Sequence, residues 1–119
     1  MSELRVLPGR YAICRLAADG AVPVSFFSAT RTPDELSIVC LEAQAPEGAK
    51  AENGWRALQV IGPLEFSLTG ILAAIAAPLA AAGISIFAIS TFDTDYVLVK
   101  EENLTKSVEA LTAAGHRVL

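Results

Sequence analysis

The sequence predicts an α+β protein of the ferredoxin-like class, in which the order βαββαβ folds into an antiparallel sheet with both helices on one face. Three observations predict this class. Two segments carry apolar residues at helical spacing, and a glycine follows each of them, Gly83 and Gly115. Runs rich in branched and aromatic residues flank both segments. All of these elements lie within residues 55–119, so that half of the chain is predicted to be a complete unit.

The first predicted strand covers residues 55–61 and runs into the breaker cluster that begins at Gly62-Pro63. A helix follows, and we expect Ser67 or Thr69 to cap it. Pro78 removes one backbone donor and is expected to bend the last turn before Gly83 ends the helix. The apolar stripe that defines this helix is made of Ile71, Leu72, Ile75 and Leu79.

Two further strands are predicted over residues 84–90 and 95–99, joined by a short turn at 91–94 into an antiparallel hairpin. Asn103 is expected to cap the second helix, and Gly115 to end it before a short strand at 116–119. The apolar stripe of this second helix consists of Leu104, Val108 and Leu111.

The first half of the chain shows a partial echo of the second at an offset of 60 residues, which places residues 26–29 on 86–89, Glu35 on Asp95, Val39 on Val99 and Glu42 on Glu102. This echo predicts an internal duplication, with chance similarity of two hairpins as the alternative. The first copy is shorter. No full helix fits before its hairpin, and residues 43–54 have the composition of a loop. We therefore predict a degenerate unit at 1–54 and a complete unit at 55–119.

Composition and charge exclude several functions. The formal net charge of −4 provides no basic surface for a nucleic acid backbone. Residues 1–5 do not resemble a secretory or transit leader, so the protein is expected in the cytoplasm. Residues 70–89 carry no charge, but Gly83 divides them into a helical and a strand-like part, which favours a buried helix and strand over a membrane span. Cys14 and Cys40 are predicted to be buried free thiols.

Residues 60–71, 77–85 and 89–95 resemble the ACT domains of bacterial tandem-ACT proteins and of the animal cytosolic arginine sensors called CASTOR, and residues 26–35 resemble the hairpin of that family's first ACT unit. The resemblance covers most of residues 10–119. It implies two tandem ACT units with a degenerate first copy, which is half of the four-unit CASTOR chain. It also implies a small-molecule ligand, an amino acid, bound between ACT units, and no cofactor or metal.

The site that this resemblance implies has two parts, the loop that enters the first helix and the turn of the following hairpin. Leu68 stands where the arginine sensors have an acidic residue for the cationic end of arginine, so the ligand implied is an amino acid that need not be arginine. The candidate ligand-binding residues are Glu65, Phe66, Ser67, Leu68, Thr69, Gly70, Ile71, Ser90, Thr91, Phe92 and Asp95.

The chemistry of an amino acid supports the same two segments. A ligand carboxylate needs backbone donors such as those at a helix N-terminus, where Gly70 permits close approach. A ligand ammonium needs an acceptor, for which Asp95 is the candidate; its alternative role is an ordinary turn acid. Ser90 and Thr91 offer hydroxyls that often satisfy local backbone groups instead. Phe92 is unusual in a turn and is expected to cover either the ligand or another subunit.

An enzyme is not predicted. His116 is the single histidine and is expected on the surface of the last strand. Asp93 and Asp95 form the one conceivable acid and base pair, but their spacing around a turn points them to opposite sides. The function expected is therefore a non-catalytic ligand sensor that forms a homodimer. The alternatives are an interaction module without a ligand that regulates a metabolic enzyme and, as the weakest, a small isomerase or lyase.

Overall fold

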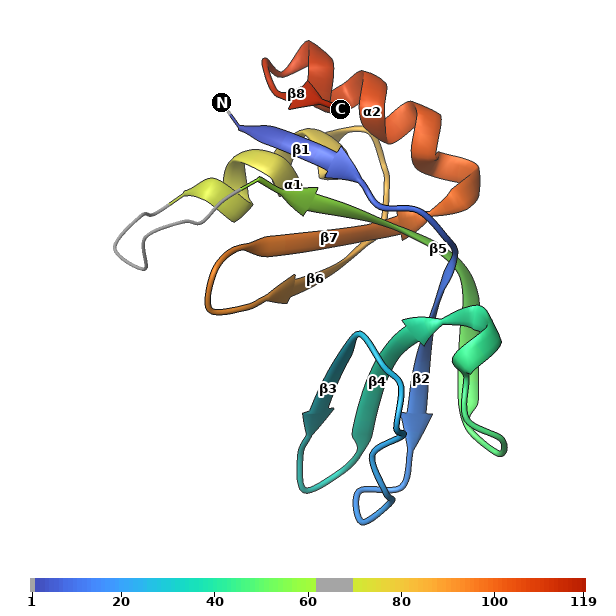
Figure 1. Cartoon of the computed structure of the whole chain (residues 1–119). Helices are drawn as coiled ribbons and strands as arrows, with labels where there is room; N and C mark the ends of the chain where they lie inside the picture. The colour runs from blue at the N-terminus through green and yellow to red at the C-terminus, as the bar shows by residue number, and fades with distance from the viewer. Residues whose placement is uncertain (1, 62–69) are drawn as a thin grey trace. The chain divides into compact units, whose positions relative to one another are not determined.

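The computed structural model describes residues 2–61 and 70–119 and shows an α+β fold with two α-helices (Figure 1). The chain divides into two compact units. One unit, here called the helical unit, combines the residues up to Pro8 with Arg56–Leu119. The other, the inserted unit, is Gly9–Trp55. The observed boundary at Trp55 lies next to the predicted one.

The helical unit contains a mixed sheet in the order β8, β1, β5, β7, β6. The strand β5 belongs to both units, and its residues from Arg56 onward lie in this one. The bounds are β1 (Glu3–Val6), β5 (Lys50–Val60), β6 (Ile86–Ser90), β7 (Asp95–Lys100) and β8 (Arg117–Val118). The α+β class and the order of the elements after residue 55 are confirmed, whereas the expected four-stranded antiparallel sheet has a fifth strand.

The additional strand is β1, which the sequence-based division placed in the first unit. It lies between β5 and β8, where Leu4 is the register partner of both Val60 and Val118. The Leu4 carbonyl accepts a hydrogen bond from the Leu119 amide at 2.8 Å. Leu4 has no exposed surface, so burial of its side chain in the core of the helical unit explains why this segment leaves the chain that follows it.

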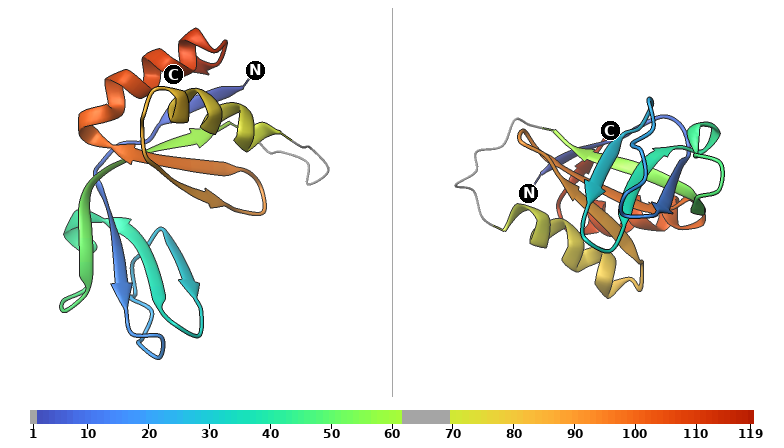
Figure 2. Two further views of the ribbon diagram at one scale, coloured as in Figure 1. Left: turned by 180° about the vertical axis from the view of Figure 1, so that it is seen from behind. Right: turned by 90° about the horizontal axis from the view of Figure 1, so that it is seen from below.

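Two helices, α1 (Ile71–Ala81) and α2 (Leu104–Ala113), cover one face of this sheet, as predicted (Figures 1 and 2). Both contribute to a single core with the inward residues of β1, β5 and β7. Its fully buried members include Leu4, Leu58, Val60, Ile75, Leu79, Val97, Val99 and Leu111. In the part of the chain that the structure describes, no helix is both long and apolar enough to cross a bilayer.

The helix α1 continues through Pro78, and His116 compensates for the donor that this proline lacks. In a regular helix the amide at position 78 would bond to the carbonyl of Ala74. Here His116 Nε2 lies 2.9 Å from the Ala74 oxygen, and His116 Nδ1 accepts the amide of Ser2 at 3.1 Å. The second bond assigns the proton to Nε2. His116 is thus buried and structural, and its predicted surface location is wrong.

The inserted unit is a four-stranded sheet in the order β3, β4, β2, β5. Its strands are β2 (Tyr11–Leu16), β3 (Ser28–Arg31), β4 (Leu36–Leu41) and the first part of β5. The one helical element of this unit is a 3₁₀ turn, η1 (Glu42–Gln44). The expected loop at 43–54 is wrong from Lys50 onward, where β5 already pairs with β2 across Arg15.

The hairpin of the inserted unit recurs in the helical unit at an offset of 59 residues. Adding 59 converts β4 into β7, and it converts η1 into the 3₁₀ turn η2 (Glu101–Asn103). The pairing registers also coincide, since Ser28 opposite Val39 corresponds to Phe87 opposite Leu98. The sequence echo at 60 is therefore one residue out of register, because it aligned apolar side chains rather than paired backbones.

Cys14 and Cys40 are buried free thiols, as predicted, in a small core with Ala12, Leu36 and Ile38. They lie on the adjacent strands β2 and β4 and hydrogen-bond to each other. Burial raises the pKa of both thiols, partly offset for Cys14 by its hydrogen bond to Cys40. Burial and then the proximity of Cys14 raise the pKa of Cys40 to about 11.

These pKa values predict that the protein loses stability in alkali. Between the ordinary thiol pKa of 9.0 and about 11, the unfolded chain releases the Cys40 proton while the folded chain retains it. The unfolded state then binds fewer protons, so the free energy of unfolding falls as pH rises through this window. Urea denaturation at about pH 8 and pH 10 measures it. The decline is expected to be shallower in Cys40→Ala, and an equal decline in both proteins would contradict the assignment.

Candidate functional site

The turn between β6 and β7 is closed by Thr91. Its amide donates to the Thr94 carbonyl at 2.8 Å, and its Oγ1 lies 3.3 Å from the Thr94 amide nitrogen. The same hydroxyl lies 3.1 Å from the Thr94 carbonyl oxygen. Thr91 therefore has the local backbone role that the sequence offered as one alternative for its hydroxyl.

Ser90 and Asp95 face each other across the base of this turn. They are register partners, and Ser90 Oγ donates to Asp95 Oδ1 at 2.6 Å. Asp95 is half-buried at the start of β7, and it receives a side-chain hydroxyl rather than capping the turn backbone. A carboxylate held by one hydroxyl keeps further acceptor capacity, which is the chemistry that a ligand ammonium requires.

Thr94 is a residue that the sequence-based interpretation missed. Its side chain is buried, and its Oγ1 donates to the Val60 carbonyl at 2.6 Å. Val60 is the last residue of β5, the strand that leads toward α1, so Thr94 fastens the turn to the end of that strand. A threonine in a polar turn gives no sequence signal for this contact, because only the packing of β7 beside β5 brings the two groups together.

The other predicted half of the site is described in part. Glu65, Phe66, Ser67, Leu68 and Thr69 lie outside the described residues, so the expected caps Ser67 and Thr69 do too. Gly70 is the N-cap of α1 and has a φ of 78°, a left-handed conformation that by itself favours glycine here. Ile71 is half-buried and packs against the core of the helical unit. The first helical bond runs from Ala74 to Gly70, so the amides before Ala74 have no partner within the helix.

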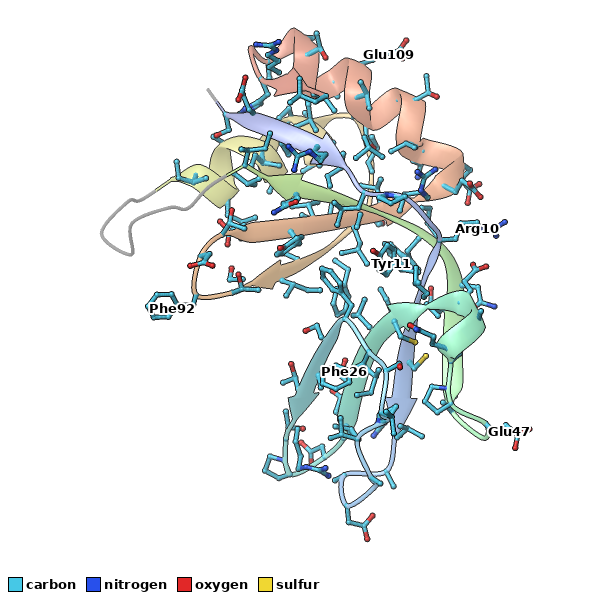
Figure 3. The ribbon with its side chains drawn as sticks, in the orientation of Figure 1. Arg10, Tyr11, Phe26, Glu47, Phe92 and Glu109 are labelled. Carbon is cyan, nitrogen blue, oxygen red and sulfur yellow. The ribbon has the colours of Figure 1, made fainter. Side chains whose placement is uncertain are left out.

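Phe92 projects from the tip of the β6–β7 hairpin, and 79% of its surface is exposed (Figure 3). It therefore lies on the same turn as Thr91 and close in sequence to Asp95. Across residues 2–61 and 70–119, no group of three or more histidine, cysteine, aspartate or glutamate side chains is arranged to hold a metal ion.

Comparison with protein families gives two matches along the chain. A model of the ACT domain matches residues 50–113, which is more than half of the chain. A second model, described as an N-terminal domain, matches residues 9–48. The two matches meet close to the boundary between the inserted and helical units.

Individual proteins resemble the chain over different lengths. The human protein named cytosolic arginine sensor for mTORC1 subunit 1 is 48% identical over 58 residues, which are 48% of this chain and 18% of that protein. This chain thus spans less than a fifth of that relative. A crystal structure of an Agobacterium tumefaciens protein is 42% identical with a TM-score of 0.92, and the match covers 99% of this chain and 92% of that one.

A more distant structural likeness is to the regulatory subunit of aspartate kinase from Thermus thermophilus. Its TM-score is 0.65 at 12% identity, over 94% of this chain and 96% of that one. At this level of identity the likeness concerns the fold, and function has to be argued from the site.

Proposed function

The chain belongs to the ACT domain family, and from that premise we propose that it is a non-catalytic regulatory protein that binds an amino acid. The observation that carries the proposal is the turn at 91–94, where Ser90 holds the Asp95 carboxylate and Thr94 fixes the turn to the end of β5. The name of the human relative, an arginine sensor, supports an amino acid as the ligand class. We place the protein in the cytoplasm.

The inserted unit supports the tandem arrangement, as a degenerate first ACT copy. Its strand order β5, β2, β4, β3 corresponds to the order 4-1-3-2 of a ferredoxin-like sheet, with a loop and η1 in place of the two helices. The hairpin repeated at 59 residues, including its turn at Thr32–Glu35, supports descent of both copies from one unit. The first copy has Leu36 where the second has Asp95, so the proposed ligand belongs to the second.

In the proposed complex the two charged ends of the amino acid bind to different elements. The ammonium lies against Asp95, and the carboxylate lies against the amides at the N-terminus of α1, whose partial positive charge favours an anion. Glu65, Phe66, Ser67, Leu68 and Thr69, which precede that helix, remain the candidates for selecting the side chain, and Phe92 remains a candidate for covering it.

A thermal-shift screen of the full chain against the twenty amino acids, each at about millimolar concentration, tests the proposal. A ligand that binds only the folded protein at about 100 times its Kd adds about 2.7 kcal/mol to the free energy of unfolding and raises Tm. In Asp95→Ala the affinity is expected to fall at least about tenfold, equivalent to about 1.4 kcal/mol. Asp93→Ala, an exposed residue of the same turn, is the matched control and is expected to bind normally.

A shift that is unchanged in Asp95→Ala would remove the proposed ammonium site while leaving an amino-acid sensor. The absence of a shift with every amino acid would contradict the sensor itself. The interaction module that regulates an enzyme without a ligand would then be the function to test, by identifying the proteins that co-purify with the chain.

A further inference from the structure

The helix α1 has no polar side chain anywhere on its circumference. Its outward-facing positions recur at one helical face and are all alanine: Ala73, Ala77, Ala80 and Ala81. A helix that is apolar all round is normally buried on all sides. The neighbouring α2 behaves differently, because its exposed positions include Thr105, Lys106 and Glu109, and Glu109 points away from the unit (Figure 3).

The strand β6 shows the same departure from an ordinary surface. Among the described residues it pairs with β7 alone, so it forms an edge of the sheet. The bond from Thr91 to Thr94 sets the alternation of the hairpin, which directs the backbone groups of Ile86, Ala88 and Ser90 away from β7. Protected edges carry charge, proline or a bulge, and β6 has none of these.

The repeated hairpin provides an internal comparison for this edge. The equivalent strand of the inserted unit is β3, which also pairs with one neighbour. Its exposed residues Ala29, Thr30 and Arg31 include a charge and a polar hydroxyl, as expected of an edge that faces water. Two edges of the same construction therefore differ in protection, and the unprotected one is β6.

The bare helix and the bare edge lie on the same side of the helical unit. The helix α2 packs on β8, the opposite edge of the sheet, and α1 packs beside α2, toward β6. Residues 70–92, which contain both elements, have no charged side chain, although the chain as a whole has a net charge of −4. Two copies can approach through this surface without burying a charge or opposing like charges, whereas their other surfaces repel.

We propose that the outer face of α1 and the edge of β6 form one two-fold interface with a second copy of this chain. The two β6 strands pair antiparallel about Ala88, so that Ile86 lies opposite Ser90 of the other copy. This pairing satisfies about six backbone hydrogen bonds, and the alanines let the two α1 helices approach closely. The inference names the surface of the homodimer that accompanies the proposed sensor function.

Light scattering of the full chain without added ligand tests the interface separately from ligand binding. The expected mass is twice 12.5 kDa at micromolar concentration. Ala77→Glu and Ala88→Lys each place a charge in the interface and are expected to weaken dimerisation at least about a hundredfold, because a buried unpaired charge is strongly unfavourable. The matched controls are Thr105→Glu on α2 and Ala29→Lys, the equivalent of Ala88 in β3, which are expected to remain dimeric.

Hydrogen exchange of the unmodified protein is a second measurement that needs no variant. The amides of Ile86, Ala88 and Ser90 are expected to exchange slowly in the dimer and faster on dilution to monomer, while those of Phe87 and Ile89 stay protected by β7. A monomer at about 100 μM would overturn the proposal. So would a dimer in which Ala29→Lys or Thr105→Glu is as disruptive as the two interface variants, or in which the three amides do not respond to dilution.

Discussion

Replacing Leu4 with alanine is expected to lower the free energy of unfolding by about 3 kcal/mol, the largest effect of a single substitution that we predict. Leu4 is fully buried between Val60 and Val118, so its removal leaves a cavity in the core of the helical unit. For a domain of this size the Tm is expected to fall by on the order of 10 °C. Urea denaturation followed by circular dichroism measures the loss.

Leu119→Ala is the matched control, because Leu119 is also near a chain end in the helical unit but is 52% exposed. Its effect is expected within about 0.5 kcal/mol. A comparably small effect of Leu4→Ala would show that residues 3–6 do not form the strand between β5 and β8.

Replacing His116 with leucine is expected to cost about 2 kcal/mol, because it removes hydrogen bonds to two part-buried backbone groups, the Ser2 amide and the Ala74 carbonyl. His116→Gln is expected to retain the bond to Ala74 and to lose about half as much. Thermal and urea denaturation of the three proteins measure the difference. A loss that is equal for leucine and glutamine would indicate that the Ala74 bond contributes nothing.

The proposed compensation between Pro78 and His116 is tested by a double-mutant cycle. In Pro78→Ala the new backbone amide can reach the Ala74 carbonyl, as in a regular helix. His116→Leu is then expected to cost about 1 kcal/mol less in the Pro78→Ala background than in the natural one. Strictly additive effects would contradict the account of how α1 tolerates its proline.

The elements of the helical unit could be predicted from sequence where local patterns are strong. The hairpin at 84–99 and the helix that Gly115 ends have apolar spacing and terminating residues that act locally, and the structure confirms them. The strand β1 was missed because its four residues, Glu3–Val6, gain their stability from partners more than 50 residues away. The same is true of His116, since its burial depends on a helix and on a strand end that are distant in sequence.

The candidate site was predictable to a lesser degree. Sequence pointed to the turn at 91–94, and the structure brings Ser90 and Asp95 together there. It could not show that the Thr91 hydroxyl is engaged by the Thr94 backbone, or that Thr94 rather than Thr91 reaches the end of β5. Hydroxyls of neighbouring threonines are chemically identical, and only their positions relative to the pleat and the adjacent strand distinguish them.

The position of β1 also affects how the protein is made. The first strand to leave the ribosome pairs with β5 and with β8, and β8 is at residues 117–118. The helical unit therefore cannot close until synthesis is almost complete, whereas the inserted unit has all of its strands once β5 has emerged. Contacts of such long sequence separation slow folding. We expect the inserted unit to fold first, and the nascent segment Glu3–Val6 to be an exposed apolar strand that depends on chaperones until the chain ends.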